Sequence, residues 1–511
     1  MKSKIWILTS LLLVAGMLLG SCAPKATPTP VVEPTKAPES TKAVETQPPL
    51  APAATDTAVP EPTATLVAPP PVEVKPGQTK IVIFVGFGTG TSPEQQPIHE
   101  QIQNEFNASH TDIQVEYLIV PYEERITKFS TMLAGDMAPD IVMPIGVGGI
   151  AEFYDEWIDL TPFIQADNYD MTRFIGLTTK IHQYPDKGIL GLPMCVYPSV
   201  VYYNSDLFDA ANVDYPPHKF GEKYADGSPW TYDKLAEIAR KITVDANGNN
   251  ADSPAFDPEN IKVWGFDGWD WWSTIGDFAQ QFGPVNGTGV SDDKKKAIIN
   301  SQPYVDAMEF MKNAIWDWHI WANNTQAGVF YDQAGDPMGS GMVGMWEVQS
   351  WMGYAYAAWD KAFNWDAAAI PSVGTNKVIS VTDADTFVIP KSSKHQKEAW
   401  EVIKWFWQNQ YLKLMTDNYS CIPADKDLAV QWKAANSQTY PKVDFQVFLD
   451  ALDYADFPNH EAWKPAYTKI NDAMNLASDA VRNGENMDVK AVLDTANAEA
   501  QKLLDEYWAS H

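Results

Sequence analysis

The chain has little cysteine and little positive charge. Three cysteines occur in 511 residues, and 37 lysines and arginines stand against 66 acidic residues, which gives a formal net charge of −29. The charge argues against nucleic acid and anionic membrane surfaces as partners, because both attract positive charge. His-Glu-x-x-His and Gly-x-Ser-x-Gly motifs, two marks of hydrolases, are also missing. We therefore expect an acidic protein that binds neutral or cationic partners and is not an enzyme.

The first residues have the features of an export signal. Two lysines precede an apolar run over residues 5–20, and a Leu-Gly-Ser string leads directly into Cys22. This order is typical of a secretory signal peptide, and the string before Cys22 resembles a bacterial lipobox. The resemblance implies that residues 1–21 are removed and that Cys22 carries lipid. The alternative is a transmembrane anchor, for which the apolar run is short.

The next segment lacks aromatic residues altogether. Residues 22–78 hold 14 of the 37 prolines, together with much alanine, threonine, valine and glutamate. Such a composition cannot bury enough apolar surface to offset chain entropy, so we expect a disordered tether. All tryptophans except Trp6 follow residue 79. The body they belong to is longer than a single core usually supports, and two lobes are expected.

Two cysteines remain after lipidation is assigned to Cys22. They are Cys195 and Cys421. An oxidising exterior would allow them to form a disulfide, but two buried free thiols are equally compatible with the sequence. The sequence leaves both alternatives open.

The start of the body alternates between strand and helix patterns. Residues 80–85, 113–119 and 140–143 are predicted strands, and a helix beginning near Ser92 and another over 126–133 lie between them. This order predicts an α/β fold with a parallel sheet and helices on both faces. The glycines after the first strand do not have dinucleotide-binding spacing. We interpret them as a loop that lines a cleft at the carboxyl ends of the strands.

An ordered set of motifs resembles the extracellular solute-binding proteins of carbohydrate ABC importers, the family that includes maltose-binding protein. The set covers about 79 to 475 and consists of Phe106-Asn107, Ile-Gln-Val-Glu-Tyr at 113–117, Lys-Phe-Ser-Thr-Met-Leu-Ala-Gly-Asp at 128–136, Ala-Pro-Asp-Ile at 138–141, Gly-Leu-Pro at 191–193, Tyr-Tyr-Asn-Ser-Asp-Leu-Phe at 202–208, Gly-Met-Trp at 344–346 through Trp351, and Phe-Val-Ile-Pro-Lys at 387–391 with Ala399-Trp400.

The resemblance implies a two-lobed periplasmic-binding-protein-like fold of type II, with discontinuous lobes joined by a hinge. We expect lobe 1 at 79–192 plus 384–422 and lobe 2 at 193–383 plus 423–511. It also implies a monomer, lipid-anchored outside the cell membrane or in the periplasm. This monomer would capture a sugar or oligosaccharide by hinge closure, deliver it to permease subunits of an ABC importer, and require no cofactor. The alternatives are a secreted glycoside hydrolase and a binding protein for a non-sugar solute.

Sugars offer apolar faces to aromatic rings and hydroxyls to carboxylates, which accept hydrogen bonds strongly. Residues 264–272 hold four tryptophans and two aspartates, and we expect Trp264 and Trp272 to lie in the core. The candidate ligand contacts, several of them placed by the resemblance, are Phe87, Tyr197, Trp269, Asp270, Trp271, Glu347, Trp351 and Trp463. Gln349 fits a hydroxyl contact or a solvated position equally well. Core packing competes with ligand contact at each of these positions.

One further segment has the alternating oxygen side chains of a calcium loop. Residues 245–252 read Asp-Ala-Asn-Gly-Asn-Asn-Ala-Asp, and the candidate ligands of a structural Ca²⁺ are Asp245, Asn247, Asn249 and Asp252. The pattern departs from an EF-hand because Phe256 stands where the bidentate glutamate belongs. A solvated turn rich in asparagine and glycine is the alternative.

Overall fold

The computed structural model describes residues 74–93, 95–268, 274–410 and 419–511. The predicted signal peptide, Cys22, nearly all of the tether, and the candidates Trp269, Asp270 and Trp271 lie outside the described residues. Among the described helices, none combines the length and apolar character needed to cross a membrane.

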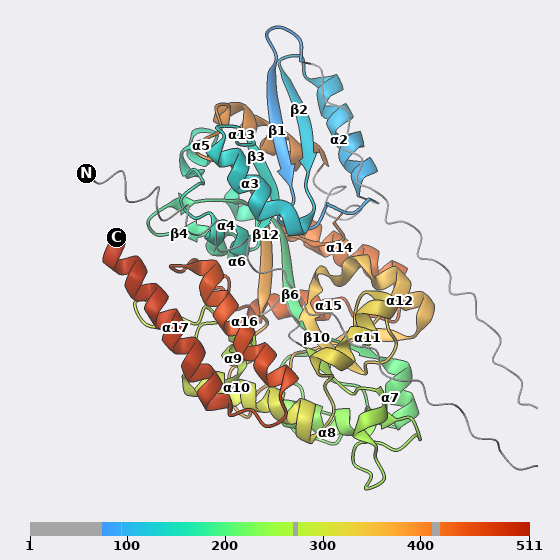
Figure 1. Ribbon diagram of the computed structural model, residues 1–511. Coiled ribbons are helices and arrows are strands. Elements are labelled where there is room, and N and C mark those ends of the chain that lie inside the picture. Colours follow the sequence, from blue (N-terminus) through green and yellow to red (C-terminus); the bar gives the residue numbers. More distant parts are fainter. Residues whose placement is uncertain (1–73, 94, 269–273, 411–418) are drawn as a thin grey trace, which may run out of the picture. The chain divides into compact units, whose positions relative to one another are not determined.

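The first sheet begins with the strand order that the sequence predicts. Its members are β1 (Thr79–Val85), β2 (Ile113–Ile119) and β3 (Ile141–Gly146), with β1 parallel to both neighbours. Along β1, Ile81, Ile83 and Val85 share one apolar cluster, whereas Phe84 belongs to another. Alternate residues of a strand point to opposite faces, so helices bury both sides of this sheet. The helices around it are α2 (Gln96–Ser109), α3 (Arg125–Ala134), α4 (Val147–Glu152), α5 (Thr161–Ala166), α6 (Gly176–Ile181) and α13 (Gln396–Trp405) (Figure 1).

The predicted helix start near Ser92 is wrong by four residues. Helix α2 begins at Gln96, with Gln95 at its N-cap and Pro97 in its first turn. The Gln95 side-chain oxygen accepts hydrogen bonds from the backbone N–H groups of Gly90 and Ser92, at 2.8 and 3.3 Å. Gln95 therefore fixes the loop that precedes the helix, and Pro97 takes the first-turn position that suits proline.

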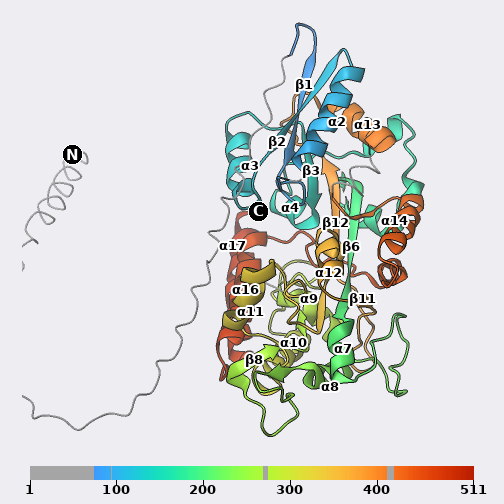
Figure 2. The same ribbon diagram turned by 90° about the vertical axis from the view of Figure 1, so that its right-hand side faces the viewer.

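One long buried strand runs through the centre of the molecule. Strand β6 (Leu192–Asn204) pairs along its first half with β12 (Thr382–Val388) and along its second half with β10 (Met345–Gln349) and β11 (Trp365–Ala368). Strand β12 also pairs with β3. Figures 1 and 2 show β6 and β12 running side by side from the β1–β3 strands toward the second group. The sheet order is β2-β1-β3-β12-β6-β10-β9, with β9 at Asp267–Gly268 and β13 (Ile422–Pro423) on β6. Two short hairpins, β4 (Gln183–Tyr184) with β5 (Gly188–Ile189) and β7 (Val244–Asp245) with β8 (Ile261–Val263), lie apart from this sheet.

Helices surround the second group of strands. Helix α8 (Tyr232–Ile242) shows why such helices form, because its buried positions Leu235, Ile238, Ala239 and Ile242 follow helical spacing and Thr231 caps its N-terminus. Its apolar face joins the largest buried cluster, which also includes residues of α16 and α17. The other helices are α7 (Ser205–Ala211), α9 (Ile275–Phe282), α10 (Gln302–Lys312), α11 (Asn324–Ala334), α12 (Tyr356–Ala362), α14 (Lys426–Thr439), α15 (Gln446–Ala451), α16 (Tyr467–Asn483) and α17 (Val489–Ser510).

The two cysteines of the body form a disulfide. Cys195 of β6 and Cys421, just before β13, are joined with their Cα atoms 5.9 Å apart. Both are fully buried, and β13 pairs with β6 beside them. The disulfide therefore links two segments 226 residues apart in the sequence.

Candidate ligand-binding site

The carboxyl ends of β1 and β3 meet at glycine-rich segments. Phe87, just after β1, forms a parallel bridge with Ile145, near the end of β3. Gly88 follows on the first segment, and Gly146 ends β3 where α4 starts. Ligands of α/β sheets bind outside this end of the strands, so the side chains around these glycines define the candidate site.

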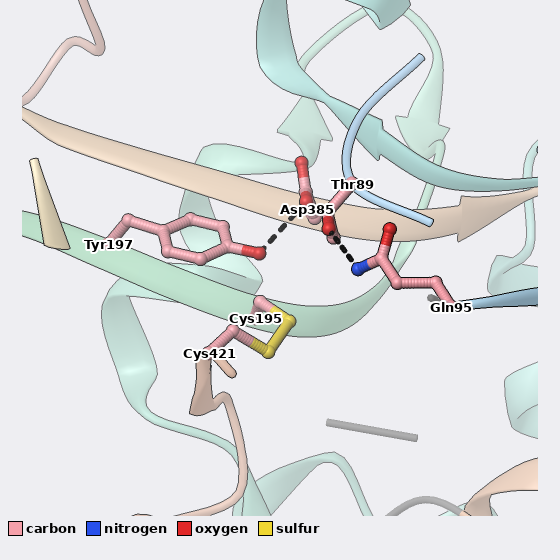
Figure 3. The surroundings of a disulfide bond; sticks show 6 residues. All are labelled: Thr89, Gln95, Cys195, Tyr197, Asp385 and Cys421. Carbon is pink, nitrogen blue, oxygen red and sulfur yellow. Dashed lines mark hydrogen bonds between the residues drawn. A yellow bond between two sulfur atoms is a disulfide. The ribbon is translucent and has the colours of Figure 1, made fainter. Parts of the chain in front are cut away.

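Asp385 of β12 places its carboxylate against the glycines. A Cβ atom at Gly88 would lie 3.3 Å from Asp385 Oδ2, and one at Gly146 would lie 3.4 Å from Oδ1. Oδ2 accepts a hydrogen bond of 3.1 Å from the Tyr197 hydroxyl of β6, close to the disulfide (Figure 3). Burial raises the pKa of Asp385 to about 7, and the hydrogen bond from Tyr197 opposes that rise. A carboxylate accepts up to about four hydrogen bonds, which leaves capacity for ligand hydroxyls.

Glu461 approaches the same place from the segment that precedes α16. Its Oε2 accepts a hydrogen bond of 2.9 Å from the backbone N–H of Gly148 in α4. Any side chain at position 148 would obstruct this contact, because a Cβ there would lie 2.6 Å from both Glu461 Oε1 and the Tyr467 hydroxyl. Burial, followed by the nearby Asp383 carboxylate, raises the pKa of Glu461 to about 7.

His460 connects two further carboxylates. Its Nδ1 lies 2.9 Å from Asp456 Oδ2, and its Nε2 lies 3.2 Å from Asp383 Oδ1. Burial alone would lower the pKa of His460, but the surrounding carboxylates, Asp277 first, outweigh burial and raise it well above the usual value. The carboxylates therefore favour the protonated imidazole, and the ring bridges the two aspartates.

Carboxylates outnumber basic side chains in this cluster. Burial raises the pKa of Asp277 to about 6 and lowers the pKa of Lys464 to about 7. The acidic cluster, as we call it below, contains five carboxyl groups and two basic side chains: Asp277, Asp383, Asp385, Asp456 and Glu461, with His460 and Lys464. Such a cluster can accept hydrogen bonds from hydroxyl groups or bind a cation.

An exposed aromatic ring lies near the cluster. Tyr122, at the start of the 3₁₀ helix Tyr122–Glu124 after β2, is 45% exposed. The carboxylates of Glu461, Asp383 and Asp385 act on its pKa, which is raised mainly by burial of the hydroxyl group. The Arg125 guanidinium lies 3.4 Å from the centre of its ring. The site thus combines hydrogen-bond acceptors with an aromatic surface.

Two predicted ligand contacts lie next to the cluster. Tyr197 reaches it directly through Asp385. Phe87 borders it, but its ring is 7% exposed and packs on the rings of Phe84, Phe129 and Phe153 at 5.5 to 5.8 Å. Core packing therefore accounts for the burial of Phe87, and ligand contact by this ring stays a prediction.

Glu347 has a partner in the protein interior. It is fully buried on β10, and the Tyr232 hydroxyl lies 2.9 and 2.8 Å from its two carboxylate oxygens. Gln349 on the same strand is 3% exposed rather than solvated. Trp351 lies in the 3₁₀ helix Ser350–Tyr354, half-buried against two apolar clusters. Strand β10 pairs with β9, which leads into residues 269–273 outside the described residues. Trp264 is 5% exposed and packs on Phe330, which confirms the core placement expected for it.

Trp463 lines a cavity near the cluster. The cavity has a volume of about 470 Å³, and Tyr154, Tyr467 and Tyr507 line it as well. The Trp463 ring stacks on Tyr154 at 4.5 Å, and Lys294 Nζ lies 4.5 Å from the ring centre. Tyr467 connects the cavity to Glu461, since both lie against Gly148.

The candidate calcium loop is organised by Asp245. Its carboxylate accepts hydrogen bonds of 2.8 to 3.0 Å from the backbone N–H groups of Asn247, Asn249 and Asp257 and from the Asn249 side chain. Asp252 pairs with Arg240 at 3.0 Å. These contacts between Asp245 and protein donors hold the turn, and calcium binding here stays a prediction.

The residues that sequence reasoning missed are the acids of the cluster. Asp383 and Asp385 stand two apart in a strand, which places both side chains on one face. His460 and Glu461 follow a Pro-Asn turn and sit next to the candidate Trp463. These local signals exist in the sequence, but nothing in it brings residue 385 next to residue 461.

The comparisons identify the family. Residues 89–411 match the bacterial extracellular solute-binding protein family. The match covers more than half of the chain, and the protein belongs to this family. Its members bind solutes, so the protein is a binding protein and not an enzyme.

Three relatives illustrate the similarity. A Brucella abortus protein described as a binding protein is 22% identical over 419 residues, which cover 81% of this chain and 91% of that protein. An ABC substrate-binding protein of Listeria monocytogenes, solved in complex with cycloalternan, has a TM-score of 0.66 and 20% identity, over 84% of this chain and 99% of that one. A solute-binding protein of Thermotoga lettingae, solved with α-D-tagatose, has a TM-score of 0.63 and 19% identity, over 84% and 100%. The expected two-lobed α/β fold of type II is confirmed.

Proposed function

We propose that the protein captures a sugar or oligosaccharide outside the cell and delivers it to the permease subunits of an ABC importer. The observation that carries the proposal is the contact between Glu461 and Gly148, which lie on segments assigned to different lobes. Beside this contact are the acidic cluster and a cavity of about 470 Å³, a volume typical of small-molecule sites. The sugars in the two solved relatives support a carbohydrate as the solute.

The cluster suits the polar rim of a sugar. Carboxylates such as Asp385 and Glu461 accept hydrogen bonds from hydroxyls, and the rings of Tyr122 and Trp463 offer surfaces for apolar sugar faces. We further propose lobe 1 at 79–192 plus 384–422 and lobe 2 at 193–383 plus 423–511. Ligand that contacts both lobes binds the closed form better and shifts the population toward it.

A thermal-shift screen of a sugar panel tests the proposal. A sugar present at about 100 times its dissociation constant adds roughly 2.7 kcal/mol to the free energy of unfolding. Chromatography of the sugar after incubation should recover it intact. Release of shorter products would contradict the proposal.

We also propose that Cys22 is the mature N-terminus and is lipid-modified, so that a proline-rich tether joins the binding body to the outer face of a membrane. The Leu-Gly-Ser-Cys string and the composition of residues 22–78 support this. Mass spectrometry of the protein from its native membrane should find no residue upstream of Cys22, and retention of residues 1–21 would contradict the proposal.

A further inference from the structure

We propose that Asp383, His460 and Glu461 form a binding site for a divalent transition-metal ion of the zinc class. The donor atoms of these three side chains all lie within 4.8 Å of one another. Among the described residues, this is the one group of three acidic or histidine side chains that lie so close. His460 is 7% exposed, and the two carboxylates are half-buried beside it. The site lies within the acidic cluster and is separate from the candidate calcium loop.

The donor spacing fits a tetrahedral ion. Ligands at zinc–nitrogen and zinc–oxygen distances of about 2.0–2.1 Å lie about 3.3 Å from each other. His460 Nε2 and Asp383 Oδ1 are already 3.2 Å apart. Glu461 supplies the third donor, since an oxygen of its carboxylate lies within 4.8 Å of the donor atoms of Asp383 and His460. Three protein ligands leave a fourth position for water or a ligand oxygen.

The surroundings of His460 match those of a metal-binding imidazole. A metal-bound histidine typically donates its second ring N–H to a carboxylate, which fixes the tautomer and the orientation of the ring. Asp456 fills this role, because its Oδ2 lies 2.9 Å from Nδ1 and its side chain is fully buried. The same Oδ2 accepts a hydrogen bond from the His460 backbone N–H at 2.7 Å. Metal binding would release the proton from Nε2 while Nδ1 continues to donate to Asp456.

The carboxylates of the cluster favour a divalent cation, and the His460 imidazole favours a transition-metal ion such as zinc over calcium or magnesium. The acidic cluster holds more carboxylates than basic side chains, and a divalent ion beside His460 would lie between the carboxylates of Asp383 and Glu461. Calcium and magnesium prefer oxygen ligands alone, whereas one imidazole with two carboxylates suits zinc and related ions.

Calorimetric titration of the EDTA-treated, dialysed full chain with ZnCl₂ tests the inference. The wild type should bind one equivalent of zinc in a site that His460→Gln abolishes. Asp456→Asn, which removes the partner that orients His460, should weaken the same site by about 10- to 100-fold. CaCl₂ should not compete. His218→Gln is the matched control, because His218 also lies between two aspartates, Asp366 at 3.0 Å and Asp444 at 3.4 Å. It should leave zinc binding unchanged.

Two results would overturn the inference: a folded wild type that takes up no zinc at micromolar concentration, or equal zinc affinity in the wild type and His460→Gln. Circular dichroism without zinc checks the fold of each variant, and Glu461→Gln replaces His460→Gln if the latter does not fold. No sugar is present in the titration, so its outcome is independent of the proposed transport function.

Discussion

The free energy of unfolding should fall as the pH rises from about 5 to 8 because Glu347 titrates, and Glu347→Gln should abolish this fall. Glu347 is fully buried, and its carboxyl group meets the Tyr232 hydroxyl at 2.9 and 2.8 Å. Burial raises the pKa of Glu347 from 4.5 to about 8, and the hydrogen bond from Tyr232 opposes that rise. Between these two pH values, the folded protein therefore holds a proton that the unfolded chain has lost.

The sign and size of the effect follow from this difference. Stability falls with pH wherever the folded state binds more protons than the unfolded state. The contribution of Glu347 is constant below pH 4.5, falls between pH 4.5 and pH 8, and is constant again above. Each pH unit costs about 1.36 kcal/mol, so the free energy of unfolding falls by about 5 kcal/mol at most over the whole range. Glutamine keeps the shape and an acceptor for Tyr232 but does not titrate.

Thermal unfolding of the two proteins from pH 5 to pH 9 measures the effect. Unfolding entropy is roughly 2.1 cal/mol/K per residue. For the protein body at residues 74–511, a change of about 1 kcal/mol in the free energy of unfolding therefore shifts Tm by about 1 °C. Between pH 5 and pH 8 the difference is about 4 kcal/mol, so Glu347→Gln should gain up to about 4 °C on the wild type as the pH rises. Glu100→Gln, at an exposed position on α2, should show no such gain. A difference between Glu347→Gln and the wild type that stays within 1 °C throughout would refute the reasoning.

Trp351→Ala should weaken sugar binding by about 2 kcal/mol or more, as loss of a stacked ring commonly does, and unchanged affinity by calorimetry in a folded variant would exclude this role. Gly148→Ala should weaken binding by displacing Glu461, whereas Gly176→Ala, where a Cβ meets nothing within 4 Å, should not; equal affinities would contradict the site. If the 245–252 loop binds calcium, EDTA should lower the Tm of the wild type but not of Asp245→Ala, and no EDTA effect would favour the plain turn.

The sequence predicted those features of the fold whose signal is local, or whose motifs follow one another in order along the chain. The strands at 80–85 and 113–119 follow from runs and alternation of apolar residues, and the structure confirms them. The ordered motifs correctly predicted the family and the two-lobed fold. The start of α2 was misplaced because Gln95 bonds to the preceding loop, a contact that helix-start patterns do not encode.

The candidate site depends on contacts between distant segments, and the sequence predicted less of it. Asp385 and Glu461 come together only because β12 lies beside β3 and the segment before α16 reaches α4. The cysteine pairing was undecided for the same reason, since 226 residues separate its partners. Glu347 receives a hydrogen bond from Tyr232, 115 residues away in the sequence, which no local pattern predicts. Contact of Glu347 with sugar stays a prediction.

Small-angle scattering tests the central claim most directly, namely that the two lobes capture a sugar by closing around it. The protein from residue 74 onward, without the tether, is measured alone and with a saturating concentration of a sugar from the thermal-shift screen. The account predicts a smaller radius of gyration with the sugar, because the ligand contacts both lobes only in the closed form. Identical scattering profiles for the empty and saturated protein would contradict it and would indicate a preformed pocket.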